Sequence, residues 1–149
     1  MFLPWKDNNP TRITPWVTLS LIAANVAVFV GELLARDPAA VFGTWGLVPA
    51  RILDGGSPVP LVTSLFLHGG FVHLGSNMLY LWIFGNNVEE LFGSVRFLLF
   101  YFLAAMGAHA AHILAGPESV VPTVGASGAV AGILGAYMFR FPDARVHTL

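Results

Sequence analysis

Apolar residues dominate four stretches of this 149-residue chain, and polar residues separate them. The apolar stretches cover residues 17–34, 71–92, 97–114 and 128–141. The first and the third contain few polar side chains, and at about 1.5 Å per helical residue each is long enough to cross most of a hydrocarbon core of about 30 Å. We therefore predict an all-α membrane protein, a polytopic bundle with four transmembrane helices.

The second and fourth stretches depart from a plain membrane span. The second is interrupted by polar residues, namely His73, Ser76, Asn77, Asn86, Asn87 and Glu89. Polar groups at membrane depth are costly and usually face the interior of a bundle, where they mark functional sites. The fourth stretch corresponds to only about 21 Å of helix. If its end reaches the cytoplasmic interface at Arg140, Ser127 lies below the outer surface, in a cavity that must admit water.

Two of the segments outside the predicted spans have sequence features that predict their location or structure. Residues 1–15 are polar and are expected to form a cytoplasmic tail. Residues 35–62 form a long connection that contains apolar residues such as Trp45. The Asp37-Pro38 pair is typical of a helix start, so we predict a short helix there, within a loop that lies in the membrane interface.

The amino-acid composition is typical of a membrane protein and limits the classes of binding partner. Apolar residues make up 56% of the chain, charged residues only 10%, and the mean hydropathy is +0.72. The lipid bilayer is therefore an expected partner. The net charge of −1 leaves no basic surface to neutralise phosphates, which argues against nucleic acid. The absence of cysteine excludes disulfides and thiolate chemistry.

The distribution of basic residues predicts the orientation. With the N-terminus in the cytoplasm and four spans, five of the seven Lys and Arg residues lie inside: Lys6, Arg12, Arg96, Arg140 and Arg145. Only two lie outside, namely Arg36 and Arg51. The positive-inside rule favours this topology in a plasma membrane, such as the bacterial inner membrane. It places His68, His73 and Asn77 on the same side as Ser127.

Ser127 is the candidate nucleophile. It lies among very small residues, in the stretch 124–132, and Gly125 permits the backbone angles of a turn into a helix. A serine hydroxyl needs a base beside it and donors for the oxyanion. The ordinary alternative is helix packing, because small residues such as Gly128, Gly132 and Ala136 recur at every fourth position.

His73 and Asn77 are four residues apart, so they share one face of a helix. Their N–H groups, together with the Ser127 backbone N–H, can form an oxyanion site. Either residue alone is more simply explained by an interhelical hydrogen bond. Together with a serine framed by glycines at the same depth, they favour catalysis.

These motifs resemble the rhomboid intramembrane serine proteases. The matching pieces are His68-x4-His73-x3-Asn77, Gly85, Val88-Glu89, Gly93 and Gly125-Ala126-Ser127-Gly128, in family order across residues 61–141. The resemblance implies a six-helix core that cleaves transmembrane substrate proteins near the outer membrane face and requires no cofactor or metal.

The resemblance also implies roles for single residues. Ser127 is the nucleophile, His73 and Asn77 stabilise the oxyanion with the backbone N–H, and His68 supports the site. Glu89 has a structural role, and Gly128 and Gly132 allow close packing.

The family's general base, a histidine on the sixth helix, has no counterpart in these 149 residues. The Trp-Arg pair often found in the first loop is also absent. We therefore expect residues 1–149 to be a single rhomboid-like domain that is incomplete at its C-terminus. The topology allows His109 or His112 to approach Ser127, but neither matches a catalytic position of the family. Lys6 and His147 are predicted at the opposite membrane face.

Two alternatives remain open. A rhomboid-like pseudoprotease or inactive fragment would bind transmembrane partners without hydrolysis, and the missing base motivates this hypothesis. A metal site or transporter could instead be built from histidines, namely His68, His73, His109 and His112. The chain has no HExxH motif, however, and the spacing of His68 and His73 is awkward for ligation from one helix.

Overall fold

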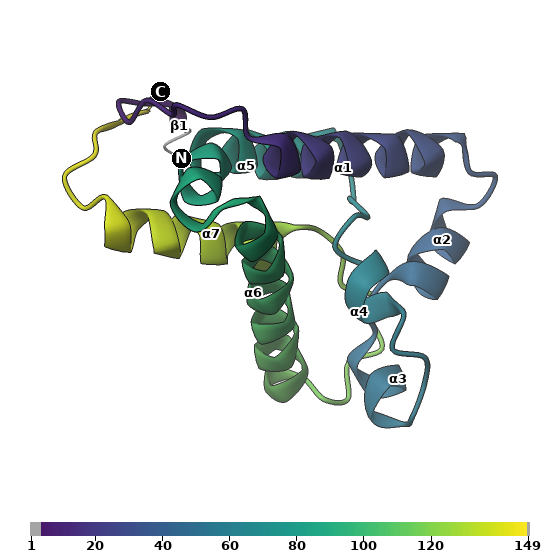
Figure 1. Cartoon of the computed structure of the whole chain (residues 1–149). Coiled ribbons are helices and arrows are strands. Elements are labelled where there is room, and N and C mark those ends of the chain that lie inside the picture. Colours follow the sequence, from purple (N-terminus) through teal and green to yellow (C-terminus); the bar gives the residue numbers. More distant parts are fainter. Residues whose placement is uncertain (1–3, 149) are drawn as a thin grey trace.

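A computed structural model describes residues 4–148 and shows a mostly helical chain (Figure 1). Four long helices are α1 (Trp16–Leu34), α5 (Phe71–Phe92), α6 (Ser94–Ala115) and α7 (Ser127–Arg140). Three short helices lie between α1 and α5: α2 (Pro38–Trp45), α3 (Pro49–Leu53) and α4 (Pro60–Thr63). Two short strands, β1 (Pro4–Asp7) and β2 (Val146–Thr148), lie near the chain ends.

The long helices coincide with the four predicted apolar stretches to within a turn at each end. Two of them, α1 and α6, are long and apolar enough to cross a membrane by length and composition. Helix α5 carries more polar residues, and α7 has 14 residues. The prediction of helices is confirmed, and the structure supports two candidate membrane spans.

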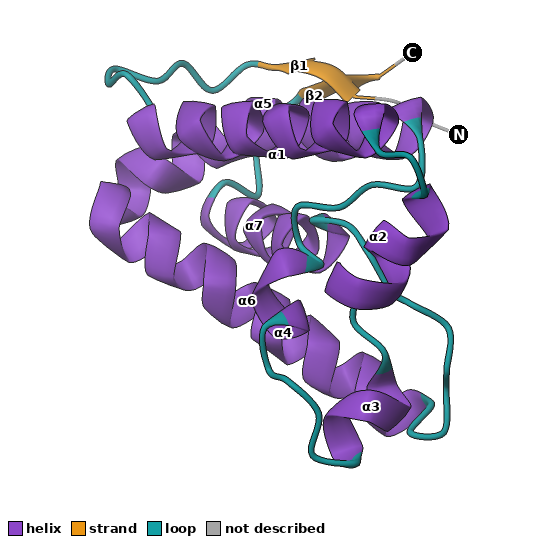
Figure 2. Ribbon diagram, turned by 90° about the vertical axis from the view of Figure 1, so that its right-hand side faces the viewer, coloured by secondary structure: helices purple, strands orange, loops and turns teal. Residues whose placement is uncertain are grey.

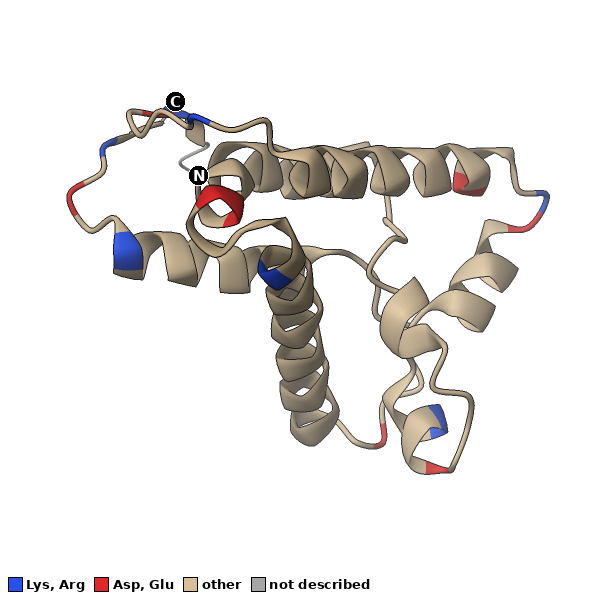
Figure 3. Ribbon diagram, viewed as in Figure 1, with Lys and Arg blue, Asp and Glu red and all other residues tan. Residues whose placement is uncertain are grey.

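Helix α5 is the centre of the bundle, because it packs against α1, α6 and α7. In both views α1 and α5 run alongside each other, and α6 extends away from them at a steep angle (Figures 1 and 2). Fully buried side chains from all of these helices except α1 form the middle of the core: Leu81, Val88, Phe97, Tyr101 and Ile133. Charged residues lie mainly at helix ends and in the connections (Figure 3).

Glu89, near the end of α5, is fully buried and joins three helices. Its carboxylate accepts hydrogen bonds from the backbone N–H groups of Val17 (3.0 Å) and Thr18 (2.8 Å), and from the Thr18 hydroxyl (2.8 Å). The Ser94 hydroxyl, at the start of α6, also donates to it (2.7 Å). The first N–H groups of a helix have no partner within the helix, and they favour a negative charge. Glu89 therefore fixes the starts of α1 and α6 to the end of α5.

Helices α6 and α7 approach closely through small residues. A Cβ added to Gly128 would overlap the Cβ of Ala108, and one added to Gly132 would overlap the Cβ of Ala104. Both glycines therefore lie where the backbones are too close for any side chain. This contact holds α7 against α6 and determines where the Ser127 end of α7 lies.

The connection 35–62 is folded and covers one side of the helices. Helix α2 begins as predicted: the Asp37 side chain accepts a hydrogen bond from the Ala40 N–H (3.1 Å). Leu47 is fully buried and exchanges two backbone hydrogen bonds with Thr123, at 3.0 and 2.8 Å. The connection thus packs onto the segment between α6 and α7. The sequence did not predict α3 and α4, which are only 5 and 4 residues long.

A two-stranded antiparallel sheet between β1 and β2 departs from the all-α prediction. Residues 4–7 of the predicted tail are paired with residues near the other end of the chain. Asp7 anchors this sheet, because its carboxylate accepts hydrogen bonds from the Tyr137 hydroxyl (2.6 Å) and from the Asn87 side-chain amide (3.1 Å). Strands of 4 and 3 residues are too short to produce a readable alternation of polar and apolar positions.

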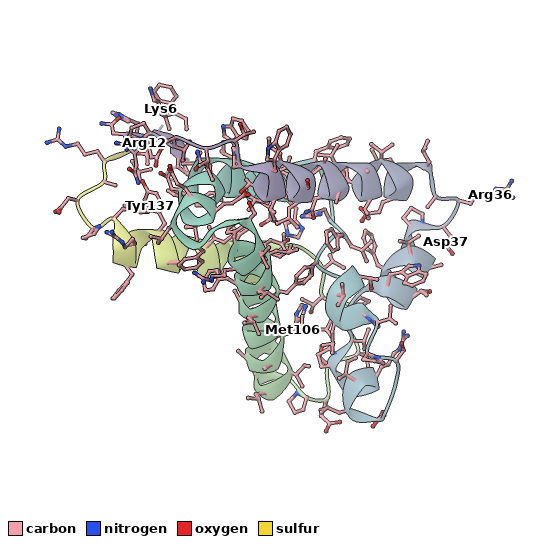
Figure 4. The ribbon with its side chains drawn as sticks, viewed as in Figure 1. Lys6, Arg12, Arg36, Asp37, Met106 and Tyr137 are labelled. Carbon is pink, nitrogen blue, oxygen red and sulfur yellow. The ribbon has the colours of Figure 1, made fainter. Side chains whose placement is uncertain are left out.

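Lys6 and Arg12 lie by the terminal sheet, and Arg36 lies at the far end of the molecule (Figure 4). The two sides assigned by the positive-inside rule are thus separate in space. Which side faces the cytoplasm remains a prediction.

The contact between α6 and α7 leads to a stability prediction. Gly132→Ala should lower the free energy of unfolding by about 1–3 kcal/mol, because the new methyl group overlaps Ala104. Gly135→Ala is the control, since nothing lies within 4 Å of its Cβ position. Adding Ala104→Gly to the Gly132 variant should restore stability. Reversible unfolding with SDS in mixed micelles measures all three, and equal stability of the two alanine variants would contradict the close contact.

A second prediction concerns Glu89. Glu89→Gln should destabilise the protein by about 2–3 kcal/mol, because the amide NH₂ cannot accept the hydrogen bonds that the carboxylate accepts from α1 and Ser94. Glu90→Gln is the matched control: the Glu90 carboxylate accepts one N–H, from Arg12 (3.1 Å), and an exposed contact of this kind contributes about 0.5 kcal/mol or less. The same SDS titration would refute the linking role if both variants unfolded alike.

Candidate active site

Ser127 is the first residue of α7, and its side chain is exposed. The turn before it is made by Gly125, whose φ of +116° is a conformation that favours glycine. The Gly125 N–H donates to the carbonyl oxygen of Ser64 (2.8 Å), which fixes this turn to the segment before α5. The Ser127 N–H lies in the first turn of the helix, where no intrahelical acceptor is available. Hydroxyl and N–H are therefore both available for chemistry.

His73 and Asn77 of α5 lie against this turn. A Cβ added to Gly125 would lie 2.6 Å from His73 Nε2 and 3.6 Å from Asn77 Nδ2. The structure thus brings the two predicted oxyanion donors, one helical turn apart, to the backbone two residues before Ser127. Gly125 leaves room for them, because any side chain at this position would displace the imidazole.

A hydrogen bond from a neighbouring residue indicates the tautomer of the neutral His73 ring. The Gly69 N–H donates a hydrogen bond to His73 Nδ1 (3.3 Å), so this nitrogen is an acceptor. A neutral imidazole with an acceptor at Nδ1 carries its proton on Nε2. Because Nε2 is the atom that faces Gly125, His73 presents an N–H donor to the turn.

The buried His68 ring packs against the His73 ring. His68 is 1% exposed, and its ring lies edge to face with the His73 ring, with centroids 5.1 Å apart. Its Nδ1–H donates to the Phe66 carbonyl oxygen (3.2 Å). Burial lowers the pKa of His68 to about 4, so the ring is neutral near pH 7.

Two of the polar atoms in this cluster are buried without a hydrogen-bond partner. These atoms are Asn77 Nδ2 and His68 Nε2. Within residues 4–148, only three other side-chain N or O atoms are buried without a hydrogen-bond partner. A buried unpaired polar group costs about 1–3 kcal/mol, so proteins rarely keep one without a reason. The free Asn77 amide is an available donor beside the Ser127 turn.

His109 and His112 hold the segments on either side of this turn. His109 Nε2 lies 3.4 Å from the Ser64 hydroxyl, and Ser64 is the residue that binds the Gly125 N–H. His112 Nε2 lies 2.7 Å from the Thr123 hydroxyl. Both histidines therefore bind hydroxyl groups of neighbouring segments.

No general base accompanies Ser127 within the described residues. Across residues 4–148, no histidine or lysine side chain forms a hydrogen bond with its hydroxyl. Lys6 and His147 are paired with each other in the terminal sheet, beyond the other end of α7. His109 and His112 have the hydroxyl partners named above.

The four histidines proposed as an alternative metal site form two separate pairs. His68 packs on His73, and His109 lies one turn before His112. In the part of the chain that the structure describes, no three His, Cys, Asp or Glu side chains gather where they could hold a metal ion. The metal-site hypothesis gains no support from the structure.

Glu32 belongs to the site's surroundings, and sequence reasoning missed it. Its carboxylate accepts the main-chain N–H of His68, with distances of 3.1 and 3.4 Å to the two oxygens. The available signal was an ionisable residue inside an apolar stretch, which is itself a reason to expect function.

A family model described as the Rhomboid domain matches residues 55–149. The match includes all four predicted site residues: His68, His73, Asn77 and Ser127. It covers more than half of the chain.

Three relatives show how the similarity is distributed. "Putative rhomboid protease YdcA" of Bacillus subtilis is 37% identical over 124 residues, which are 83% of this chain and 55% of the relative. "Rhomboid protein 1, mitochondrial" of Saccharomyces cerevisiae is 35% identical over 121 residues, 72% of this chain and 35% of the relative. "Rhomboid protease GluP" of Bacillus subtilis is 43% identical over 79 residues, 53% of this chain and 15% of the relative.

This chain spans between 15% and 55% of the length of these three relatives. The matched region nevertheless contains the site residues and three of the four long helices. Family match and apolar helices lead to one conclusion: the chain belongs to the rhomboid family and is a membrane protein.

Proposed function

We propose that this chain provides the nucleophile and the oxyanion donors of an intramembrane serine endopeptidase, which cleaves transmembrane proteins near the outer membrane face. One observation carries the proposal: His73 Nε2 and Asn77 Nδ2 converge on Gly125, two residues before Ser127. The names of two relatives, a "Rhomboid protease" and a "Putative rhomboid protease", support the same reaction class.

In the proposed reaction a base removes the proton of the Ser127 hydroxyl as the oxygen attacks the carbonyl carbon of the scissile peptide. The carbonyl oxygen becomes an oxyanion that accepts hydrogen bonds from the Ser127 N–H, His73 Nε2–H and the Asn77 amide. When the tetrahedral intermediate collapses, the peptide C–N bond breaks and the protonated base gives its proton to the leaving amine. Water, activated by the same base, then hydrolyses the acyl-enzyme.

We infer that the base is a histidine outside residues 4–148. Ser127 lacks a basic partner in the described part of the chain, and the chain spans at most 55% of the length of the three relatives. In this proposal residues 1–149 are one rhomboid-like domain, and further helices complete the site.

The proposed topology has α1, α5, α6 and α7 in the bilayer and the N-terminus in the cytoplasm, in a plasma membrane such as the bacterial inner membrane. It rests on the five-to-two distribution of Lys and Arg. Because α7 has only 14 residues, Ser127 would lie below the outer surface, where a polar cavity must supply the hydrolytic water. The connection 35–62 would lie in the outer interface.

The lack of a basic partner for Ser127 within residues 4–148 also favours a second candidate. A rhomboid-like pseudoprotease would use the same bundle to bind transmembrane partners without hydrolysis. The two candidates differ in one measurable property, the reactivity of Ser127.

Covalent labelling of Ser127 distinguishes the protease from the pseudoprotease. In the protein purified as its own host makes it, a fluorophosphonate should label Ser127, because the probe mimics the tetrahedral intermediate at an activated serine. Ser127→Ala should abolish both labelling and cleavage of a transmembrane reporter, whereas the loop variant Ser57→Ala should retain them. A folded wild-type protein that neither labels nor cleaves would refute the protease and favour the binding protein.

Kinetics test the oxyanion donors. His73→Ala and Asn77→Ala should each lower kcat by about 10²–10³-fold, with little change in KM, because their hydrogen bonds strengthen only in the transition state. Asn86→Ala is the control, since it lies on the same helix at the end away from Gly125. A rise in KM with unchanged kcat would show that these residues only bind substrate.

A further inference from the structure

Glu32 is a buried acid that the proposed reaction does not use. It lies near the end of α1 and is 6% exposed. It lines an apolar cavity of about 320 Å³ together with residues of α1, α2 and the segment around α4: Val28, Gly31, Val41, Trp45, Phe66 and Leu67. An ionisable side chain in such surroundings is costly, so its retention points to a role.

The Glu32 side chain forms its hydrogen bond with His68, a residue of the candidate site. Both carboxylate oxygens lie within reach of the His68 main-chain N–H, at 3.1 and 3.4 Å. His68 belongs to the segment between α4 and α5, which has no regular secondary structure of its own. A residue on a long helix therefore holds a short irregular segment in place.

That segment determines how His73 is presented. The His68 ring packs against the His73 ring, with centroids 5.1 Å apart. The next residue, Gly69, donates its N–H to His73 Nδ1 (3.3 Å). This hydrogen bond keeps the ring proton on Nε2, the atom that faces Gly125.

We propose that Glu32 is a positioning residue that keeps the oxyanion donor His73 in its donating tautomer and orientation. The inference rests on the proposed function, and it assigns Glu32 no contact with substrate. The carboxylate acts through two consecutive peptide groups, those of His68 and Gly69. Without it the buried His68 N–H loses its acceptor, and the segment that carries the Gly69 N–H is released.

The consequence for His73 is chemical as well as geometric. If the Gly69 N–H leaves Nδ1, the ring can take the other neutral tautomer, with the proton on Nδ1. Nε2 then bears a lone pair that repels an oxyanion. Losing one oxyanion donor costs about 10²–10³-fold in kcat, and partial loss of its orientation costs less.

Kinetics of Glu32 variants provide the first test. Glu32→Ala should lower kcat by about 10–100-fold with KM changed less than about twofold. Glu32→Gln keeps an acceptor oxygen and should recover most of the activity. Glu32→Asp keeps the negative charge, but its shorter side chain cannot reach the His68 N–H as well. This variant replaces Glu32→Ala in the test if the alanine variant does not fold. Glu90→Gln, a distant acid that also accepts one backbone N–H, should leave kcat unchanged. Wild-type kcat in folded Glu32→Ala or Glu32→Asp would overturn the proposal.

A double-mutant cycle separates positioning from general stability. If Glu32 acts through His73, then Glu32→Ala should have no further effect on kcat in a His73→Ala background. If the loss of kcat in the double variant equals the product of the losses in the two single variants, Glu32 acts independently of His73, and the proposal is overturned.

Histidine ¹⁵N NMR provides a readout that does not depend on activity. Wild-type His73 should show a protonated Nε2 and a bare Nδ1, and the proton should shift toward Nδ1 in Glu32→Ala and Glu32→Asp but not in Glu90→Gln. An unchanged tautomer in the Glu32 variants would refute the positioning role even in an active protein. If wild-type Ser127 does not react with the fluorophosphonate while the tautomer responds to Glu32, the proposed function fails and the structural link stands.

Discussion

The fold depends on one buried carboxylate, that of Glu89. It accepts hydrogen bonds from the first turn of α1 and from Ser94 at the start of α6, while its own backbone belongs to α5. A charged acceptor is the strongest partner for the unpaired N–H groups of a helix start, and the surrounding apolar side chains exclude competing water. Three helices are thereby fixed at one end of α5. The other end, which carries His73 and Asn77, extends from this anchored region to the Ser127 turn.

A second constraint is the lack of side chains where α7 meets its neighbours. Gly128 and Gly132 lie against alanines of α6, and Gly125 lies against His73 and Asn77 of α5. A methyl group at Gly128 or Gly132 would push α6 and α7 apart, and one at Gly125 would displace the His73 imidazole. The same close approach that packs α7 therefore brings the turn before Ser127 beside two N–H donors. Close packing of the 124–132 stretch is therefore compatible with the chemistry proposed for Ser127.

The site is completed by residues outside the predicted set of site residues. Thr123 pairs with Leu47 of the long connection, Ser64 binds the Gly125 N–H, and Glu32 holds the segment that presents His73. Rigid support of this kind is what oxyanion donors require, because their contribution depends on being oriented before the reaction. It also keeps the Asn77 amide, a buried donor without a hydrogen-bond partner, beside the turn before Ser127.

The sequence by itself determined the features that are written in local patterns. Hydrophobic runs and polar interruptions placed the four long helices, the Asp37-Pro38 pair placed the start of α2, and the four-residue spacing put His73 and Asn77 on one face of α5. The motif order indicated the family. Only the tertiary structure decided that Glu32 binds His68, that Asp7 binds Tyr137, and that β1 pairs with β2. These contacts join residues 36 to 144 positions apart, and such contacts leave no periodic signal because they depend on where whole helices lie.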